Sequence, residues 1–183
     1  MEKVKELREI YSAQSIQARV RELADEIGRD YGGRPFTAVC VLNGAFMFFG
    51  DLIRHIKSDL LEVSFMRLSS YGGGTESSQD VKILYGPEIE LEGRDVLIVD
   101  DILDTGLSME KAIGYIKDKG AGQVRVCVMI DKLQRRISQS VRPDYSGFRL
   151  DRGFIVGYGL DLDDRYRNLD AIYEVVFEQS HGT

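Results

Sequence analysis

Two adjacent carboxylates and a short polar run at residues 100–108 form the chemically richest segment of the chain. Asp100 and Asp101 stand together, and residues 104–108 read Asp-Thr-Gly-Leu-Ser. Neighbouring carboxylates repel each other unless a cation or sugar hydroxyls lie between them. A glycine and hydroxyl side chains at the start of a helix instead offer N–H groups to an anion. A sugar phosphate would satisfy both halves of this segment.

The flanking residues predict how this segment is positioned. Residues 94–101 contain four consecutive aliphatic residues and predict a strand that is buried on both faces. Residues 107–118 carry apolar side chains at helical spacing and predict an amphipathic helix. The acids would then lie at the carboxyl end of a strand, where open α/β sheets bind ligands. A plain turn with solvated acids and an ordinary helix cap is the alternative.

The rest of the chain continues an α/β pattern. Helices are predicted over 12–30 and 45–56, and strands over 37–42, 62–68, 81–85, 124–132, 145–150 and 154–156. The connection from the strand at 94–101 through a helix to the strand at 124–132 implies a parallel pair with a right-handed crossover. We therefore expect one α/β domain over residues 1–183, with a mainly parallel central sheet flanked by helices.

Composition excludes several classes of partner. The formal net charge is −6 and the basic residues are scattered, which argues against nucleic acid. No segment approaches the ~18 continuous apolar residues of a membrane span, and the N-terminus lacks the apolar core of a signal peptide. Cys40 and Cys127 lie within apolar runs, which predicts reduced, buried thiols and a cytoplasmic protein.

Three separate motifs resemble one known family. Residues 99–106, Val-Asp-Asp-Ile-Leu-Asp-Thr-Gly, resemble the phosphoribosyl-pyrophosphate (PRPP) loop of the type I phosphoribosyltransferases, although the hypoxanthine-guanine branch usually has Glu in place of Asp100. Residues 154–161, Phe-Ile-Val-Gly-Tyr-Gly-Leu-Asp, closely match the purine hood of that branch. Ser70 and Tyr71, followed by three glycines, are similar to its lid. The likeness runs from about residue 12 to residue 174.

This resemblance implies a fold and an activity. The fold would be that of the type I phosphoribosyltransferases, with a small hood subdomain at about 145–175 and a mobile lid loop at about 69–80. The activity would be purine salvage, in which Mg²⁺-dependent transfer of 5-phosphoribosyl from PRPP to N9 of hypoxanthine or guanine gives IMP or GMP and pyrophosphate. The family also forms homodimers and homotetramers, so a homo-oligomer is implied.

The resemblance assigns the sugar-phosphate end of the ligand to several residues. Asp100 and Asp101 would hold ribose hydroxyls and Mg²⁺, with Asp161 near a metal-bound water. Pyrophosphate would contact Asn43, Gly44 and Arg167, although the family commonly has Lys or Arg where this chain has Asn43. The 5′-phosphate would lie against Asp104, Thr105, Gly106, Leu107 and Ser108.

The purine end is implied in the same way. Lys132 would donate to the 6-oxo group, Phe154 would stack on the ring, and the backbone of Ile155 would read its edge. Asp104 would be the general acid/base at purine N7. Without the match, Lys132 and Arg167 would pass for surface charges and Phe154 for a core residue. The purine-binding set as a whole is Ile102, Lys132, Phe154, Ile155 and Asp161.

Two other functions compete with this interpretation. A phosphoribosyltransferase of the same class could prefer xanthine, which the sequence does not distinguish from guanine. A non-catalytic protein with the same fold could regulate by binding nucleotides and RNA, but such a protein should carry a basic face, and this acidic chain has dispersed Lys and Arg residues.

Overall fold

A six-stranded sheet forms the centre of the molecule. The computed structural model describes residues 3–70, 81–138 and 140–178. Strand order in the sheet is β4-β3-β2-β5-β6-β7, and only the β3–β4 pair is antiparallel. The expected mainly parallel sheet is therefore confirmed. Its strands are β2 (Phe36–Leu42), β3 (Leu61–Ser70), β4 (Val81–Tyr85), β5 (Asp95–Leu103), β6 (Val124–Lys132) and β7 (Tyr145–Leu150).

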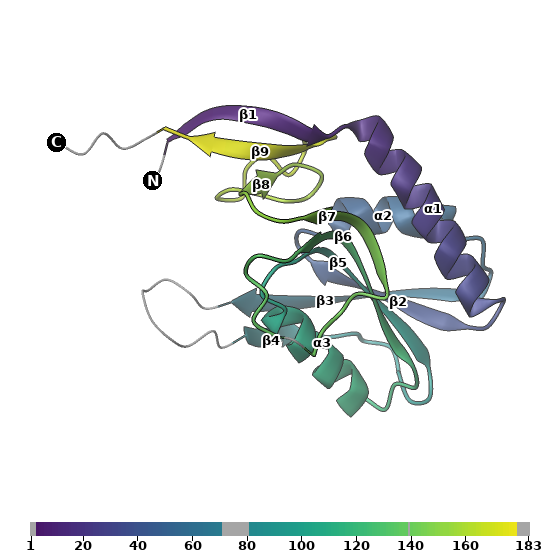
Figure 1. The fold of residues 1–183 in the computed structure, drawn as a ribbon. Helices are drawn as coiled ribbons and strands as arrows, with labels where there is room; N and C mark the ends of the chain where they lie inside the picture. Colours follow the sequence, from purple (N-terminus) through teal and green to yellow (C-terminus); the bar gives the residue numbers. More distant parts are fainter. Residues whose placement is uncertain (1–2, 71–80, 139, 179–183) are drawn as a thin grey trace.

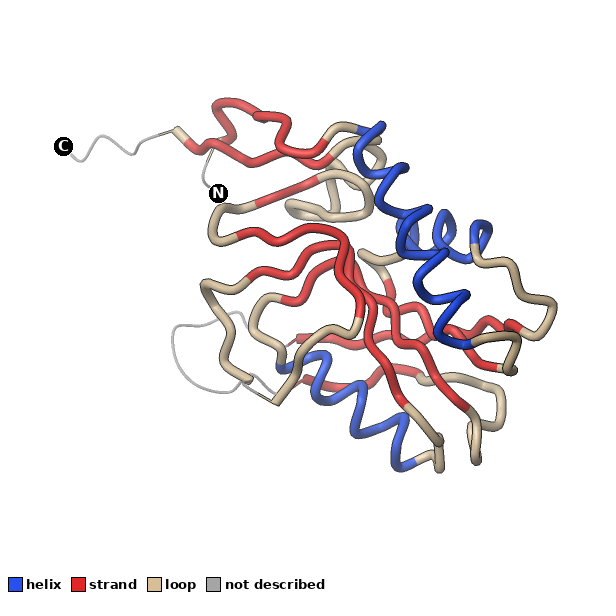
Figure 2. Tube along the Cα trace, turned by 45° about the vertical axis from the view of Figure 1, so that its right-hand side comes forward, coloured by secondary structure: helices blue, strands red, loops and turns tan. Residues whose placement is uncertain are grey.

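Three helices cover this sheet. Helices α1 (Ala13–Tyr31) and α2 (Phe46–His55) pack on one face, and α3 (Leu107–Asp118) packs on the other (Figures 1 and 2). The Ser12 side chain caps α1 by accepting a hydrogen bond from the Ser15 N–H at 3.3 Å, and Gly32 ends the helix in a left-handed conformation. All three helices lie within two residues of their predicted bounds, because their apolar stripes and end signals are local.

A small second sheet lies over the carboxyl ends of the main strands (Figure 1). It has the order β1-β9-β8, with β1 (Val4–Tyr11), β9 (Ile172–Phe177) and β8 (Ile155–Val156). Neither β1 nor β9 is predicted from the sequence. Charged residues interrupt both segments, so neither shows a clear apolar alternation. The expected hood also began at residue 145, whereas β7 belongs to the main sheet.

Strand β5 continues two residues beyond its predicted end. It reaches Leu103, so Asp100 and Asp101 are the sixth and seventh residues of the strand rather than its end. In the register with β6, Asp100 lies opposite Val128 and Ile102 opposite Ile130, so the two carboxylates lie near the carboxyl end of that strand. Cys40 and Cys127 are free and buried, as predicted, and burial raises the pKa of the Cys40 thiol to about 12. None of the helices described is both long and apolar enough to cross a bilayer.

Candidate functional site

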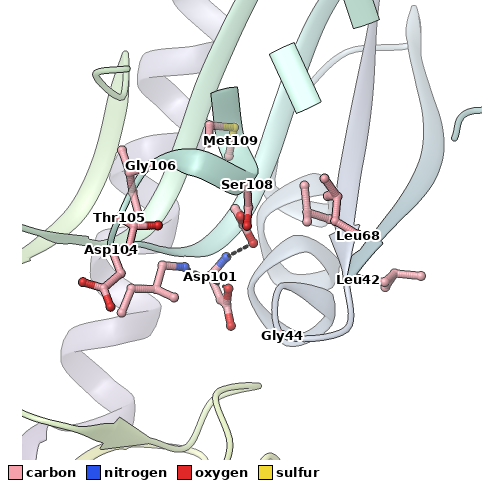
Figure 3. Close-up of a pocket in the computed structure, with 13 residues that line it drawn as sticks. Leu42, Gly44, Leu68, Asp101, Asp104, Thr105, Gly106, Ser108 and Met109 are labelled. Carbon is pink, nitrogen blue, oxygen red and sulfur yellow. Dashed lines mark hydrogen bonds between the residues drawn. The ribbon is translucent and has the colours of Figure 1, made fainter. Parts of the chain in front are cut away.

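A cavity of about 250 Å³ opens at the carboxyl ends of β2 and β5. The acidic segment forms one wall, and the loop after β2 and Leu68 of β3 form the other. Figure 3 shows the Asp101 side chain between the residues from Asp104 to Ser108 and the loop at Gly44. The strand-loop-helix pattern thus brings Gly44 and the predicted residues of segment 100–108 other than Leu107 around one space, at the edge where open α/β sheets bind ligands. The other predicted residues whose side chains the structure describes do not line this cavity, and they are Asn43, Leu107, Lys132, Phe154, Ile155, Asp161 and Arg167.

Asp100 and Asp101 form the floor of this cavity. Asp100 Oδ1 accepts the Asp101 N–H at 2.9 Å, and Asp101 Oδ1 accepts the Ile102 N–H at 2.9 Å. Loss of solvent, followed by the charge of Asp101, holds the pKa of Asp100 well above its usual value. Loss of solvent also raises the pKa of Asp101. A cation or a pair of ribose hydroxyls would relieve this repulsion.

The loop between β5 and α3 has the geometry of an anion site. Gly106 has φ +85°, a left-handed conformation that glycine adopts without strain. It precedes Leu107 as the N-cap of α3 and supplies no side-chain cap. The Leu107 N–H donates to Thr105 Oγ1 at a long 3.4 Å, and Ser108 lines the cavity. The positive end of the dipole of α3 therefore faces the cavity, and its N–H groups have few hydrogen-bond acceptors within the loop.

Asp104 carries an unsatisfied carboxylate oxygen. Its Oδ1 is buried without a hydrogen-bond partner among the described residues. The other oxygen, Oδ2, lies 3.5 Å from Nη1 of Arg135, an exposed side chain. A buried acceptor without a donor is costly unless a ligand supplies one. A protonated ring nitrogen of a base would be such a donor.

The turn after β2 is in close contact with both neighbouring motifs. The Leu42–Asn43 peptide is cis, and the Asn43 side chain is exposed. A Cβ built on Gly44 would overlap the Asp101 carboxylate, so only glycine fits there.

Arg167 donates to the Gly159 carbonyl at 2.8 Å and pairs with Asp161 at 2.9 Å. The positive charge of Arg167 also lowers the pKa of Asp101, which partly offsets the effect of burial.

The residues predicted to bind the base divide between the two sheets. Lys132 ends β6 and is only 7% exposed, and no partner of its ammonium group is found in the described part of the chain. Ile102 pairs in register with Ile130 and lines the cavity. Phe154 precedes β8, is 44% exposed, and meets the Phe177 ring edge-on with centroids 5.9 Å apart. Ile155 is buried in β8, which lies over this edge of the main sheet (Figure 1).

The acidic residues suit a Mg²⁺ ion that arrives with a ligand better than a resident metal. Within residues 3–70, 81–138 and 140–178, no group of three metal-binding side chains is present. Asp161 faces Arg167 instead of joining Asp100 and Asp101. Mg²⁺ typically uses one or two carboxylates together with water and substrate phosphates. The carboxylate pair at 100–101 fits that mode.

Two predicted residues lie at the limit of what the structure describes. Ser70 is the last residue of β3, the strand whose Leu68 lines the cavity. Tyr71 lies outside the described residues. One contact between the segment after β8 and the main domain is not predicted: the Tyr158 hydroxyl donates to Asp51 of α2 at 2.7 Å. No local pattern marks this pair, since the two residues are 107 positions apart.

The chain is similar to known proteins along most of its length. The model of the family described as "Phosphoribosyl transferase domain" matches residues 6–163. A hypoxanthine-guanine phosphoribosyltransferase of Aquifex aeolicus is 41% identical over 172 residues, covering 93% of this chain and 96% of the relative. One from Streptococcus thermophilus is 40% identical over 163 residues, with 89% of each chain covered. A crystal structure of a Bacillus anthracis hypoxanthine-guanine phosphoribosyltransferase has a TM-score of 0.87 and 37% identity, covering 95% of this chain and all of the other.

Proposed function

We propose that this chain, which belongs to the phosphoribosyltransferase family and to its hypoxanthine-guanine branch, transfers 5-phosphoribosyl from PRPP to N9 of hypoxanthine or guanine. The products would be IMP or GMP and pyrophosphate, which makes the enzyme one of purine salvage. One observation carries the proposal: an acidic pair and a helix N-terminus without a side-chain cap line the same cavity. A sugar phosphate needs both.

The sugar-phosphate end would be held by the loop and the acids. The N-terminus of α3 and the hydroxyl groups of Thr105 and Ser108 would bind the 5′-phosphate. Asp100 and Asp101 would accept hydrogen bonds from the ribose hydroxyls, which would replace the solvent whose loss raises both pKa values and would offset the charge of Asp101 beside Asp100. Pyrophosphate would bind at the turn of Asn43 and Gly44, and Arg167 would leave its carboxylate partners to reach it.

The base would lie between the two sheets. Phe154 would stack on the purine, and the backbone at Ile155 would read its edge. Lys132 would donate to the 6-oxo group, a role that its burial without a partner favours. Adenine would place an amino group there and leave the buried charge of Lys132 unpaired. A site of this kind therefore discriminates strongly against adenine.

Asp104 would handle the proton of the base. Its unpaired Oδ1 is the acceptor for a proton at purine N7 as the anomeric carbon moves from pyrophosphate to N9. Mg²⁺, bound with PRPP at the carboxylate pair, would neutralise the departing pyrophosphate. The lid that the resemblance implies would exclude water from the charged anomeric carbon, and residues 71–80 of this predicted lid lie outside the described residues.

The first test is pyrophosphate release with PRPP and Mg²⁺, run in parallel with hypoxanthine, guanine, xanthine, adenine and uracil. We expect turnover with hypoxanthine or guanine and none with adenine or uracil. Turnover with xanthine alone would retain the class and change the preferred base. Binding of PRPP without turnover of any base would contradict the proposed reaction and favour a regulator.

We also propose that two copies of the chain associate through the uncovered side of β3 and β4. Helix α2 packs on β2 and β5, which leaves Phe65 on the same face 44% exposed beside the edge of Phe49. Phe46 is exposed in α2 and Val63 in β3, and Tyr85 of β4 is exposed opposite Arg67. Exposed apolar side chains are therefore present on α2, on β3 and on the edge strand β4. Burying such a surface against its own copy would stabilise a homodimer, which could pair further into a tetramer.

Analytical ultracentrifugation tests this interface. Phe65→Asp should convert the oligomer to monomers, because a carboxylate would be buried in an apolar contact. Leu133→Asp, at another exposed apolar residue, is the matched control and should retain the native mass. Native protein that sediments as a monomer would contradict the proposal.

We also infer a cytoplasmic location from the two free, buried thiols, which cell fractionation would test.

A further inference from the structure

Arg136 lies behind the proposed phosphate loop, residues 104–108, and its side chain donates several hydrogen bonds there. Its side chain is only 11% exposed and pairs with Asp131 at 2.6 Å. The same guanidinium donates to the carbonyls of Leu103 at 2.9 Å and Asp104 at 3.0 Å. It also donates to the Lys132 carbonyl at 3.1 Å. One buried cation therefore joins the end of β5, the phosphate loop and the end of β6.

The segment that carries Arg136 continues this contact. The N–H groups of Ile137 and Ser138 both donate to the Thr105 carbonyl, at 2.9 Å and 3.0 Å. Three consecutive carbonyls, those of residues 103–105, are thus held on the side of the loop that faces residues 136–138. Gly106 packs on the same segment, since a Cβ there would lie 3.3 Å from Arg136 Cδ.

The planarity of the peptide bond gives this arrangement a consequence for ligand binding. In a trans peptide the carbonyl of one residue and the N–H of the next point in opposite directions. Carbonyls held toward Arg136 therefore turn the N–H groups of Asp104, Thr105 and Gly106 away from it. Asp104, Thr105 and Gly106 line the cavity and Arg136 does not. Within the described chain, the N–H groups of Thr105 and Gly106 have no hydrogen-bond acceptor.

We propose that Arg136 is a positioning residue for the 5′-phosphate: it holds the loop carbonyls so that the backbone N–H groups face the anion. This inference rests on the proposed assignment of the loop to the 5′-phosphate. A planar guanidinium with five donors can reach several carbonyls and a carboxylate at once, whereas an ammonium group cannot span them. The guanidinium of Arg136 also donates to the carbonyl of Lys132. The same side chain therefore contacts both the phosphate loop and the residue proposed to recognise the base.

Arg136→Lys is the decisive variant, because it keeps a positive charge beside Asp131 and removes the planar fork. Calorimetry would measure two probes: ribose 5-phosphate, which binds at the phosphate loop, and Mg²⁺-pyrophosphate, which binds at the Gly44 turn. We expect the affinity for ribose 5-phosphate to fall about tenfold or more, as for the loss of a charge-assisted hydrogen bond, with pyrophosphate affinity unchanged. Arg142→Lys, at an exposed arginine of the same connection, should bind both probes like the native protein.

Equal losses for both probes would indicate a general structural defect and overturn the inference, as would native affinity for ribose 5-phosphate. A measurement on the native protein covers the case in which the variant does not fold. Addition of ribose 5-phosphate should shift the amide resonances of Thr105 and Gly106 downfield, and unchanged resonances in a protein that binds the probe would contradict the role. Native protein that binds no ribose 5-phosphate would overturn the loop assignment and this inference with it.

Discussion

The backbone of Gly159 rests directly on the carbonyl of Gly44, and Gly44 in turn rests on the carboxylate of Asp101. A Cβ on either glycine would overlap the group beneath it. Gly159 comes from the loop after β8, Gly44 from the turn after β2, and Asp101 from β5. Three motifs distant in sequence are therefore packed without space for a methyl group. This row of contacts fixes the relative positions of the proposed pyrophosphate, ribose and base sites.

Replacing Gly44 with alanine should disrupt this row of contacts. The methyl group would displace Asp101 or the turn, so we expect kcat/KM for PRPP to fall about 100-fold or more, as for a misplaced reacting group. Gly50→Ala is the control, since Gly50 lies in α2 with open space at its Cβ position and alanine favours helices. Steady-state kinetics of both variants checks this. Native activity in Gly44→Ala would show that the packing is not required.

Removing the ammonium group of Lys132 should affect the base more than PRPP. Lys132→Ala loses one charge-assisted hydrogen bond to the 6-oxo group, so kcat/KM for hypoxanthine should fall about 10- to 100-fold. The dissociation constant of PRPP, measured by calorimetry, should change less than about twofold. Lys117→Ala, on the exposed side of α3, serves as the control. Equal losses for base and PRPP would remove the role assigned to Lys132.

Neutralising Asp104 should slow chemistry and spare binding. Asp104→Asn keeps the size of the side chain but cannot accept a proton, so kcat should fall about 10²- to 10⁴-fold. The dissociation constant of PRPP should stay near that of the native protein, because the loop backbone is unchanged. A variant with native turnover would exclude Asp104 as the general acid/base.

The acidic pair should make the ligand-free protein less stable as pH rises. Because the pKa of Asp100 is raised by burial, the native state binds protons more tightly than the unfolded chain does. The free energy of unfolding should therefore decrease from the ordinary aspartate pKa of about 3.9 up to the raised native pKa. Thermal unfolding at several pH values without Mg²⁺ would measure this slope.

Asp100→Asn should flatten that slope, since asparagine does not titrate. The same linkage predicts that Mg²⁺ and PRPP bind more tightly as pH rises through this interval, because binding releases protons from the pair. A stability profile that is identical in the native protein and in Asp100→Asn would show that Asp100 titrates normally.

Asn43 offers a gain-of-function test. The side chain is exposed at the pyrophosphate turn, and Asn43→Lys would add a positive charge there without displacing other groups. We expect pyrophosphate to bind about two- to fivefold more tightly, the range of an exposed ion pair, with the gain lost at high salt. Gln123→Lys, at the opposite end of the sheet, is the control for net charge. Unchanged affinity would place the anion away from residue 43.

Local patterns were sufficient for most of the fold and for part of the site. Helix α3 and strand β6 occupy their predicted residues because an apolar stripe and a buried aliphatic run are readable within a few positions. The acids, threonine, glycine and serine at residues 100–108 predicted a sugar-phosphate site, and the structure gathers these residue types around one cavity at the carboxyl edge of the sheet. Roles for Phe154 and Arg167 came only from resemblance, because a lone aromatic or arginine carries no local signal.

The sequence by itself determined the main sheet and the chemistry of the loop after β5, since periodicity and side-chain type are properties of neighbouring residues. Only the tertiary structure decided what depends on distant pairs. Charged strand β1 finds its place by backbone hydrogen bonds to β9, which require no apolar pattern. Arg136 differs from its neighbour Arg135 only by being buried against the loop carbonyls, and Tyr158 meets Asp51 across 107 residues. Contacts of this kind follow from the packing of whole elements, which no short segment encodes.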